Sequence, residues 1–143
     1  MIGIEPMKNE DLAQVVAIER LSFAAPKDEA VFRHDEIKYL VANENDKVVG
    51  YIGFEKIAGE IHIINMAVHP DHRGKGIGKK LMEEALISKE VVFLEVRVSN
   101  LPAQKIYEHF GFKKVGMRKG YYQDNGEDAI LMRREPKGQV TND

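Results

Sequence analysis

The feature that most constrains the fold is a strand, a glycine-rich loop and a helix that follow one another over residues 61–86. Residues 61–68 are mostly apolar and follow a turn, and residues 73–78 contain three glycines. After the loop, one helical face is apolar and the other carries Lys and Glu, the apolar positions being Ile77, Leu81, Met82, Ala85 and Leu86. A strand that leads into a helix through such a loop predicts an α/β domain.

The remaining segments extend this pattern. A helix capped by Asn9 is predicted near residues 12–23, and a short helix near residues 30–37. Strands are predicted at residues 39–42 and 48–54 as a hairpin, and at 91–98 in the centre of the sheet. A second long helix is expected to begin at Asn100 and to end at Gly111. Residues 113–122 and 127–133 are expected to form a final hairpin.

Length and composition exclude several classes of protein. The 143 residues predict one domain over residues 1–134, with a frayed polar tail over residues 135–143. The 21 basic and 23 acidic residues are interspersed, which argues against a nucleic-acid partner. The absence of cysteine excludes disulfides and thiolate metal sites. No apolar run reaches the roughly 20 residues of a membrane span, and no leader pattern is present, so we expect no membrane partner and a cytoplasmic protein.

The glycine-rich loop predicts an anion site, because backbone N–H groups and the helix dipole favour a phosphate at a helix start. A Walker loop does not fit, since Arg73 stands where its first glycine is required and Lys80 where it needs Ser or Thr. A dinucleotide fingerprint that starts at Gly74 fails at Lys79. The alternative interpretation is a solvated turn that carries lysines.

The spacing Arg73-x-x-Gly76-x-Gly78 resembles the GNAT acetyltransferase superfamily. The resemblance implies a mixed sheet of about six to seven strands flanked by about four helices, and acetyl-CoA as co-substrate without a metal. It also implies that the pyrophosphate is held by Arg73, Gly74, Lys75, Gly76, Ile77, Gly78 and Lys79. On the preceding strand, Met66, Ala67 and Val68 would bind the pantetheine arm.

A second block sharpens the resemblance. Leu94-Glu95-Val96-Arg97-Val98-Ser99-Asn100 is followed by Tyr107 and, later, by Arg118-x-x-Tyr121-Tyr122 and Gly126-Glu127-Asp128-Ala129. These blocks are similar to the RimI-like N-terminal amine acetyltransferases. The resemblance implies an enzyme that transfers acetyl to the N-terminal amine of a protein.

The same resemblance implies catalytic roles. Glu95 would be the general base, and burial at the sheet centre would strengthen it. His62 is the competing base, because it lies on the same strand face as Met66 and titrates near neutrality. Tyr107 would be the general acid near the sulfur. Asn100 would cap its helix and hydrogen-bond the cofactor, and the N–H of Met66 or Ala67 would polarise the thioester carbonyl.

Each of these residues also has a structural interpretation. Glu95 could be a buried structural carboxylate, Tyr107 a core side chain, and His62 a polar residue of a half-exposed strand. Tyr121 and Tyr122 either contact the substrate peptide or pack across the hairpin.

The substrate and the oligomeric state stay open at this point. Residues 23–29 lack the aromatic, proline-rich character usual in the RimI-like subgroup, and the chain has no tryptophan. The acceptor is therefore a protein N-terminus, a lysine, or a small amine such as a polyamine or aminoglycoside. A non-catalytic acyl-CoA-binding module is the rival from another class, and the presence of both Glu95 and Tyr107 argues against it.

Overall fold

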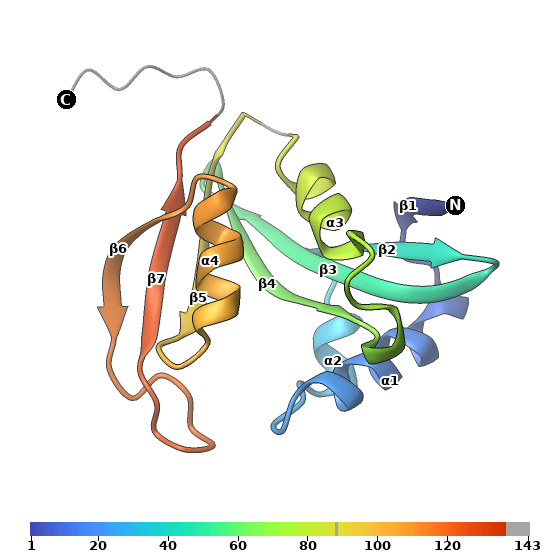
Figure 1. The fold of residues 1–143 in the computed structure, drawn as a ribbon, viewed down its shortest axis with the longest axis horizontal. Helices are drawn as coiled ribbons and strands as arrows, with labels where there is room; N and C mark the ends of the chain where they lie inside the picture. The colour runs from blue at the N-terminus through green and yellow to red at the C-terminus, as the bar shows by residue number, and fades with distance from the viewer. Residues whose placement is uncertain (88, 137–143) are drawn as a thin grey trace. The chain divides into compact units, whose positions relative to one another are not determined.

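The computed structural model describes residues 1–87 and 89–136 (Figure 1). Within them, seven strands follow the hydrogen-bonded order β1-β2-β3-β4-β5-β7-β6 and are accompanied by four α-helices, which confirms the predicted fold class. The chain clusters into two compact units. The first unit comprises Met1–Lys56 and Ile64–Ile87, and the second comprises Ile57–Ile63 and the described residues from 89 onward. The single domain over residues 1–134 stays a prediction.

The first unit is built on an antiparallel ladder of β1 (Ile2–Pro6), β2 (Ile37–Glu44) and β3 (Lys47–Ile57). Asn45 and Asp46 join β2 to β3 with φ values of 52° and 64°. Two consecutive residues with positive φ are the geometry of a tight hairpin turn that matches the twist of its strands. The predicted hairpin is therefore confirmed, with longer strands than the sequence indicated.

Helices cover both faces of this ladder (Figure 1). The side chains of α1 (Leu12–Ser22) and α2 (Glu29–Phe32) share a core with Tyr39, Val41 and Tyr51 of the strands. On the other face Gly50 leaves room for α3 (Ile77–Ala85), because a Cβ there would lie 3.2 Å from both Ile77 and Leu81. The apolar face predicted for α3 is thus the buried one.

Gly53 gives a testable measure of how tightly this core is packed. A Cβ at Gly53 would lie 2.6 Å from Asn65 Oδ1 and would also collide with the Tyr39 ring. We expect Gly53→Ala to lower the free energy of unfolding by about 1–3 kcal/mol, the usual cost of overpacking a core. Gly3→Ala is the control, since no atom lies within 4 Å of a Cβ there. Urea denaturation of both variants tests this, and equal stability of the two would contradict it.

The second unit centres on β5 (Val91–Arg97). The first residues of β4 (Glu60–Val68) pair with β5 in parallel, with His62 opposite Phe93. On its other edge β5 pairs antiparallel with β7 (Ala129–Arg134), which pairs with β6 (Lys113–Arg118). α4 (Leu101–His109) begins at Asn100, whose Oδ1 accepts the Ala103 N–H at 3.2 Å, and Gly111 follows it at φ 93°. Both predicted helix ends are confirmed.

Some predicted boundaries are wrong. β1 was not predicted from the sequence, and Asn9 does not cap α1. It begins a short 3-10 helix, Asn9–Asp11, in which Asp11 accepts the Lys8 N–H at 2.9 Å. The helix expected near residues 30–37 is the single turn α2, and β2 already begins at Ile37. The last hairpin is shorter than predicted, because residues 119–128 form hydrogen bonds of their own.

The predicted tail begins inside the described residues, where Glu135 pairs with Arg133 at 2.8 Å. Residues 137–143 of that tail lie outside the described residues. No helix in the described ranges is long and apolar enough to cross a membrane. Among the same residues, no group of three or more His, Cys, Asp or Glu side chains could hold a metal ion.

Candidate active site

The glycine-rich loop of the first unit is fixed at both ends. It follows β4 through a 3-10 turn, Pro70–His72, and leads directly into α3. The Arg73 Nε donates to the Val68 carbonyl at 3.0 Å, and its Nη2 lies 3.3 Å from Ser22 Oγ of α1. Arg73 therefore holds the loop in shape through its own side chain.

The loop presents backbone N–H groups at the start of α3. Gly74 and Gly76 adopt φ values of 82° and 79°, which residues with a Cβ rarely adopt. The first hydrogen bond of the helix runs from the Lys80 N–H to the Gly76 carbonyl at 3.1 Å, so the N–H groups of residues 77–79 have no acceptor within the helix. A Cβ built on Gly74 or Gly76 meets no atom within 4 Å. Open space, free N–H groups and a helix dipole suit an anion such as a diphosphate.

The strand residues before the loop, 66–68, differ in how deeply they are buried. Ala67 is buried in the core of the first unit, while Met66 and Val68 are half-buried on the opposite face of β4. The Val68 carbonyl is already bound by Arg73. Lys75, in the loop, lies 3.6 Å from the Glu44 carboxylate.

Glu95 lies in the second unit, on the half-buried face of β5. The alternate residues Val92, Leu94 and Val96 are buried, whereas the Glu95 side chain keeps 23% of its surface exposed. Its Oε1 lies 3.2 Å from the Arg118 Nε. The burial expected for this carboxylate is thus only partial, because β6 brings a guanidinium to it instead of an apolar cover.

Tyr107 lies on α4, with its ring edge-on to Phe112 at a centroid distance of 5.9 Å. Burial raises the pKa of Tyr107, so its phenol stays protonated at neutral pH. Asn100 is exposed at the start of the same helix and caps it. The structure therefore supplies a protonated phenol on the helix where a general acid was expected.

Tyr121 and Tyr122 pack edge-to-face with centroids 5.1 Å apart. Burial raises the pKa of Tyr122 to about 12, the Arg97 guanidinium opposes this, and the charges of Tyr121, Glu95 and Tyr107 add to it. Burial and then the Glu95 charge also raise the pKa of Tyr121. Tyr122 therefore lies within electrostatic range of Glu95, Tyr107 and Tyr121, and Tyr121 lies within range of Glu95.

His62 is placed next to this group by strand pairing. It stacks on Phe93 at a centroid distance of 5.4 Å and an interplanar angle of 20°, and it lies 3.9 Å from Glu60. Because Phe93 and Glu95 are two residues apart on one strand, they share a face, and so does His62. The imidazole remains 34% exposed.

No role in the site was predicted from the sequence for Arg97, Arg118 or Glu127, although all three stand in the motifs that carry the resemblance. Their contacts join residues 23 to 30 positions apart in sequence, which no local pattern reveals. Asn65 was missed as well: it is 9% exposed and buried beside Tyr39.

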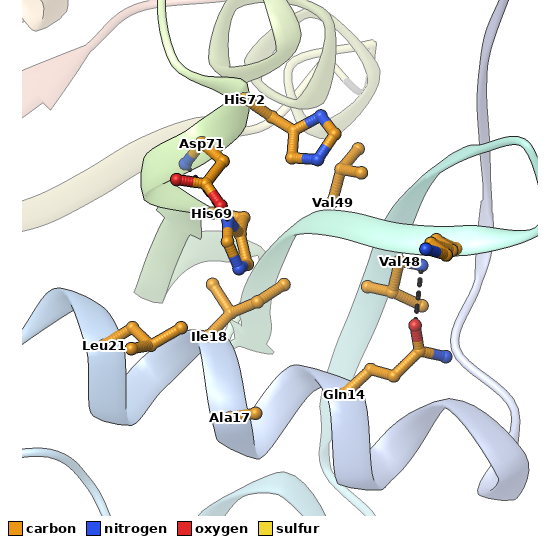
Figure 2. Close-up of a pocket in the computed structure, with 10 residues that line it drawn as sticks. Gln14, Ala17, Ile18, Leu21, Val48, Val49, His69, Asp71 and His72 are labelled. Carbon is orange, nitrogen blue, oxygen red and sulfur yellow. Dashed lines mark hydrogen bonds and ion pairs between the residues drawn. The ribbon is translucent and has the colours of Figure 1, made fainter.

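A separate cavity of about 350 Å³ lies in the first unit between α1, the start of β3 and the turn after β4 (Figure 2). Gln14 borders it and accepts the Val48 N–H at 3.0 Å. His69, Asp71 and His72 line the opposite wall. None of the predicted site residues lines this cavity.

Comparison with known proteins agrees with these features. Residues 7–112 match the model of the acetyltransferase (GNAT) family. The chain is 32% identical over 142 residues to the ribosomal protein bS18-alanine N-acetyltransferase of Escherichia coli K12, covering 92% of this chain and 96% of that protein. It is 37% identical over 149 aligned positions to an N-alpha-acetyltransferase of Saccharolobus solfataricus, covering 87% of each.

The crystal structure of the E. coli ribosomal-protein-S18-alanine N-acetyltransferase superposes with a TM-score of 0.88 at 28% identity, covering 100% of this chain and 98% of that one. The residues that match the family model, 7–112, include the glycine-rich loop, Glu95 and Tyr107. The chain therefore belongs to the GNAT family and is an acetyl-CoA-dependent N-acetyltransferase.

Proposed function

We propose that this protein acetylates the N-terminal α-amino group of a protein or peptide, with Glu95 as general base and Tyr107 as general acid. The observation that carries the proposal is the arrangement around Tyr122 in the second unit: Tyr122 lies within electrostatic range of the partly exposed carboxylate of Glu95, of the protonated phenol of Tyr107 and of Tyr121. The relatives from E. coli and S. solfataricus are a ribosomal protein bS18-alanine N-acetyltransferase and an N-alpha-acetyltransferase, which supports the same acceptor.

The proton transfers match these side chains. A protein α-amino group has a pKa of about 7.7–8.0 against about 10.4 for lysine, so a modest base suffices to give the neutral nucleophile. Glu95 accepts that proton at its carboxylate, directly or through a water. Tyr107 donates its phenolic proton to the departing thiolate, because its raised pKa keeps the proton available.

We assign His62 a role in binding the acceptor and not the role of general base. Its ring stacks on Phe93 and lies 3.9 Å from the Glu60 carboxylate, so these neighbours set its position. Tyr121 is 47% exposed, and with Tyr122 it offers rigid aromatic surface for the first residues of a peptide.

Acetyl-CoA supplies the acetyl group as an activated thioester. In the first unit, the N–H groups of residues 74–79 fit its diphosphate, and Arg73 keeps the loop in the required conformation. Met66, Ala67 and Val68 provide strand backbone for the pantetheine arm. The N–H of Met66 or Ala67 polarises the thioester carbonyl. The side-chain amide of Asn100, at the start of α4, hydrogen-bonds the cofactor.

Gly76 tests the diphosphate assignment. An alanine at Gly76 either keeps a strained positive φ or moves the neighbouring N–H groups, so we expect acetyl-CoA to bind about tenfold more weakly, the equivalent of one hydrogen bond. Gly59→Ala is the matched control, since Gly59 has a φ of 80° and equally open surroundings. Both variants should lose about 1 kcal/mol of folding free energy. Calorimetric titration with acetyl-CoA that shows equal affinities for the two variants would contradict the assignment.

The acceptor is tested by measuring coenzyme A release with a thiol reagent, against peptides with free N-termini, N-terminally blocked lysine peptides, and small amines. The protein contributes no background because it has no cysteine. We expect turnover on free N-terminal peptides. Turnover confined to polyamines or aminoglycosides would keep the acetyltransferase and overturn the peptide acceptor.

A further inference from the structure

Arg97, the last residue of β5, binds four groups in the segment that carries Tyr121 and Tyr122. We name residues 119–128 the tyrosine segment. The Arg97 Nη2 contacts both carboxylate oxygens of Asp124 at 3.0 Å, and its Nη1 contacts Glu127 Oε1 at 3.2 Å and Asn125 Oδ1 at 3.3 Å. The guanidinium carbon also lies 3.9 Å from the centre of the Tyr122 ring. Only a planar cation with several N–H donors can form these hydrogen bonds and the ring contact at the same time, and the lysine ammonium is not such a group.

The same network continues to the start of α4. The second carboxylate oxygen of Glu127 accepts the Ser99 N–H at 2.7 Å, and the hydrogen bonds from Ser99 lead the causes that lower the pKa of Glu127 to about 2. The buried Gln104 donates from Nε2 to the carbonyls of Arg97 and Val98, at 3.0 and 2.9 Å. The backbone of Arg97 is therefore fixed from α4, and its side chain fixes the tyrosine segment.

Inside the tyrosine segment, backbone bonds place Tyr122 accurately. The Tyr122 N–H donates to the Glu127 carbonyl at 3.1 Å, and the Gly126 N–H donates to the Tyr122 carbonyl at 2.7 Å. Without Arg97, no guanidinium would lie between the carboxylates of Asp124 and Glu127. Because these two negative charges repel each other, we expect the backbone hydrogen bonds of Tyr122 and Gly126 to break more often.

We infer that Arg97 is a positioning residue, which holds Tyr121 and Tyr122 in the conformation that receives the acceptor peptide. The inference rests on the proposed function and adds a determinant of acceptor binding that does not touch the reacting atoms. When the tyrosine segment is already ordered before the peptide binds, the free energy of binding does not include the entropic cost of ordering that segment. Loss of Arg97 therefore raises the KM for the peptide, whereas the affinity for acetyl-CoA depends on other residues.

The experiment compares Arg97→Met with Arg97→Lys by hydrogen exchange and by steady-state kinetics. For Arg97→Met we expect amide exchange in the tyrosine segment to speed up about tenfold or more, because the bonds of Tyr122 and Gly126 open more often. The peptide KM should rise about 10- to 100-fold, with the acetyl-CoA KM changed less than about twofold. Arg97→Lys should recover only part of the loss, since it restores charge without the bidentate geometry.

Two further variants keep the test decisive. Glu127→Gln retains Arg97 and removes one of its carboxylate partners, so it should reproduce the faster exchange in milder form, even if Arg97→Met folds poorly. Arg133→Met is the control for exchange: Arg133 also carries an ion pair, to Glu135 at 2.8 Å, and a ring contact, to Phe93 at 5.5 Å. It should leave exchange in the tyrosine segment unchanged.

Unchanged exchange in the tyrosine segment of both Arg97→Met and Glu127→Gln would overturn the inference, and so would equal rises in the two KM values. Absence of peptide turnover in the wild-type protein would instead overturn the proposed acceptor. In that event the exchange measurement alone still decides whether Arg97 orders the segment.

Discussion

Glu95→Gln is expected to lower kcat/KM for peptide acetylation by about 10²- to 10⁴-fold, the usual contribution of a general base. Glutamine keeps the shape of the side chain and an oxygen that accepts from Arg118, which lies 3.2 Å from the carboxylate, but it does not take up the amine proton. Acetyl-CoA affinity should be retained. Coenzyme A release at saturating acetyl-CoA, with a short peptide as acceptor, provides the measurement.

Two variants control for this result. Glu108→Gln removes an exposed carboxylate of α4 and should act like the wild type. His62→Gln tests the rival base, and because His62 is fixed by stacking on Phe93 we expect it to affect the peptide KM more than kcat. If Glu95→Gln keeps more than about half of the activity while His62→Gln loses a hundredfold, the base is His62.

Tyr107→Phe is expected to lower kcat by about 10²-fold or more, because the departing thiolate loses its proton donor. The ring packing against Phe112 at 5.9 Å is kept, so the unfolding midpoint should stay close to that of the wild type. Burial raises the pKa of Tyr107, and an acid with a raised pKa stays protonated to higher pH. The wild-type kcat should therefore show no loss from this group up to about pH 10, the ordinary pKa of tyrosine.

A pH series of kcat for the wild type and for Tyr107→Phe separates this role from a structural one. A variant that folds normally and retains full kcat across the series would show that Tyr107 is a packing residue and that another group, or water, protonates the sulfur.

Those parts of the fold that depend on local chemistry were predicted from the sequence. Asn100 and Gly111 bound α4 as expected, because side-chain capping and a left-handed glycine act within a few residues. β1 was missed because a strand of five residues with two isoleucines has little pattern of its own, and its pairing with β2 makes it a strand. Asn9 does not cap α1 because it lies inside the preceding 3-10 turn, so that Asp11 takes the position before the first residue of α1.

In the candidate site, residue types were predictable but their partners were not. Arg73 was expected at the cofactor, which stays a prediction, but its side-chain bonds to Val68 and to Ser22, 51 positions away in sequence, were not predicted. Glu95 was expected to be buried, and Arg118 reaches it from β6. Arg97 was quoted within a motif without a role, since its hydrogen-bond partners lie 27 to 30 positions further on in the sequence. Such contacts arise only when strands and loops are assembled.

The most direct test of the central claim is to locate the acetyl group by tandem mass spectrometry on one peptide that has both a free N-terminus and an internal lysine. The expected result is acetyl on the α-amino group alone, with no product from the same peptide blocked at its N-terminus. Acetyl on the lysine ε-amino group of the blocked peptide, at a comparable rate, would contradict the claim that this protein acetylates N-termini.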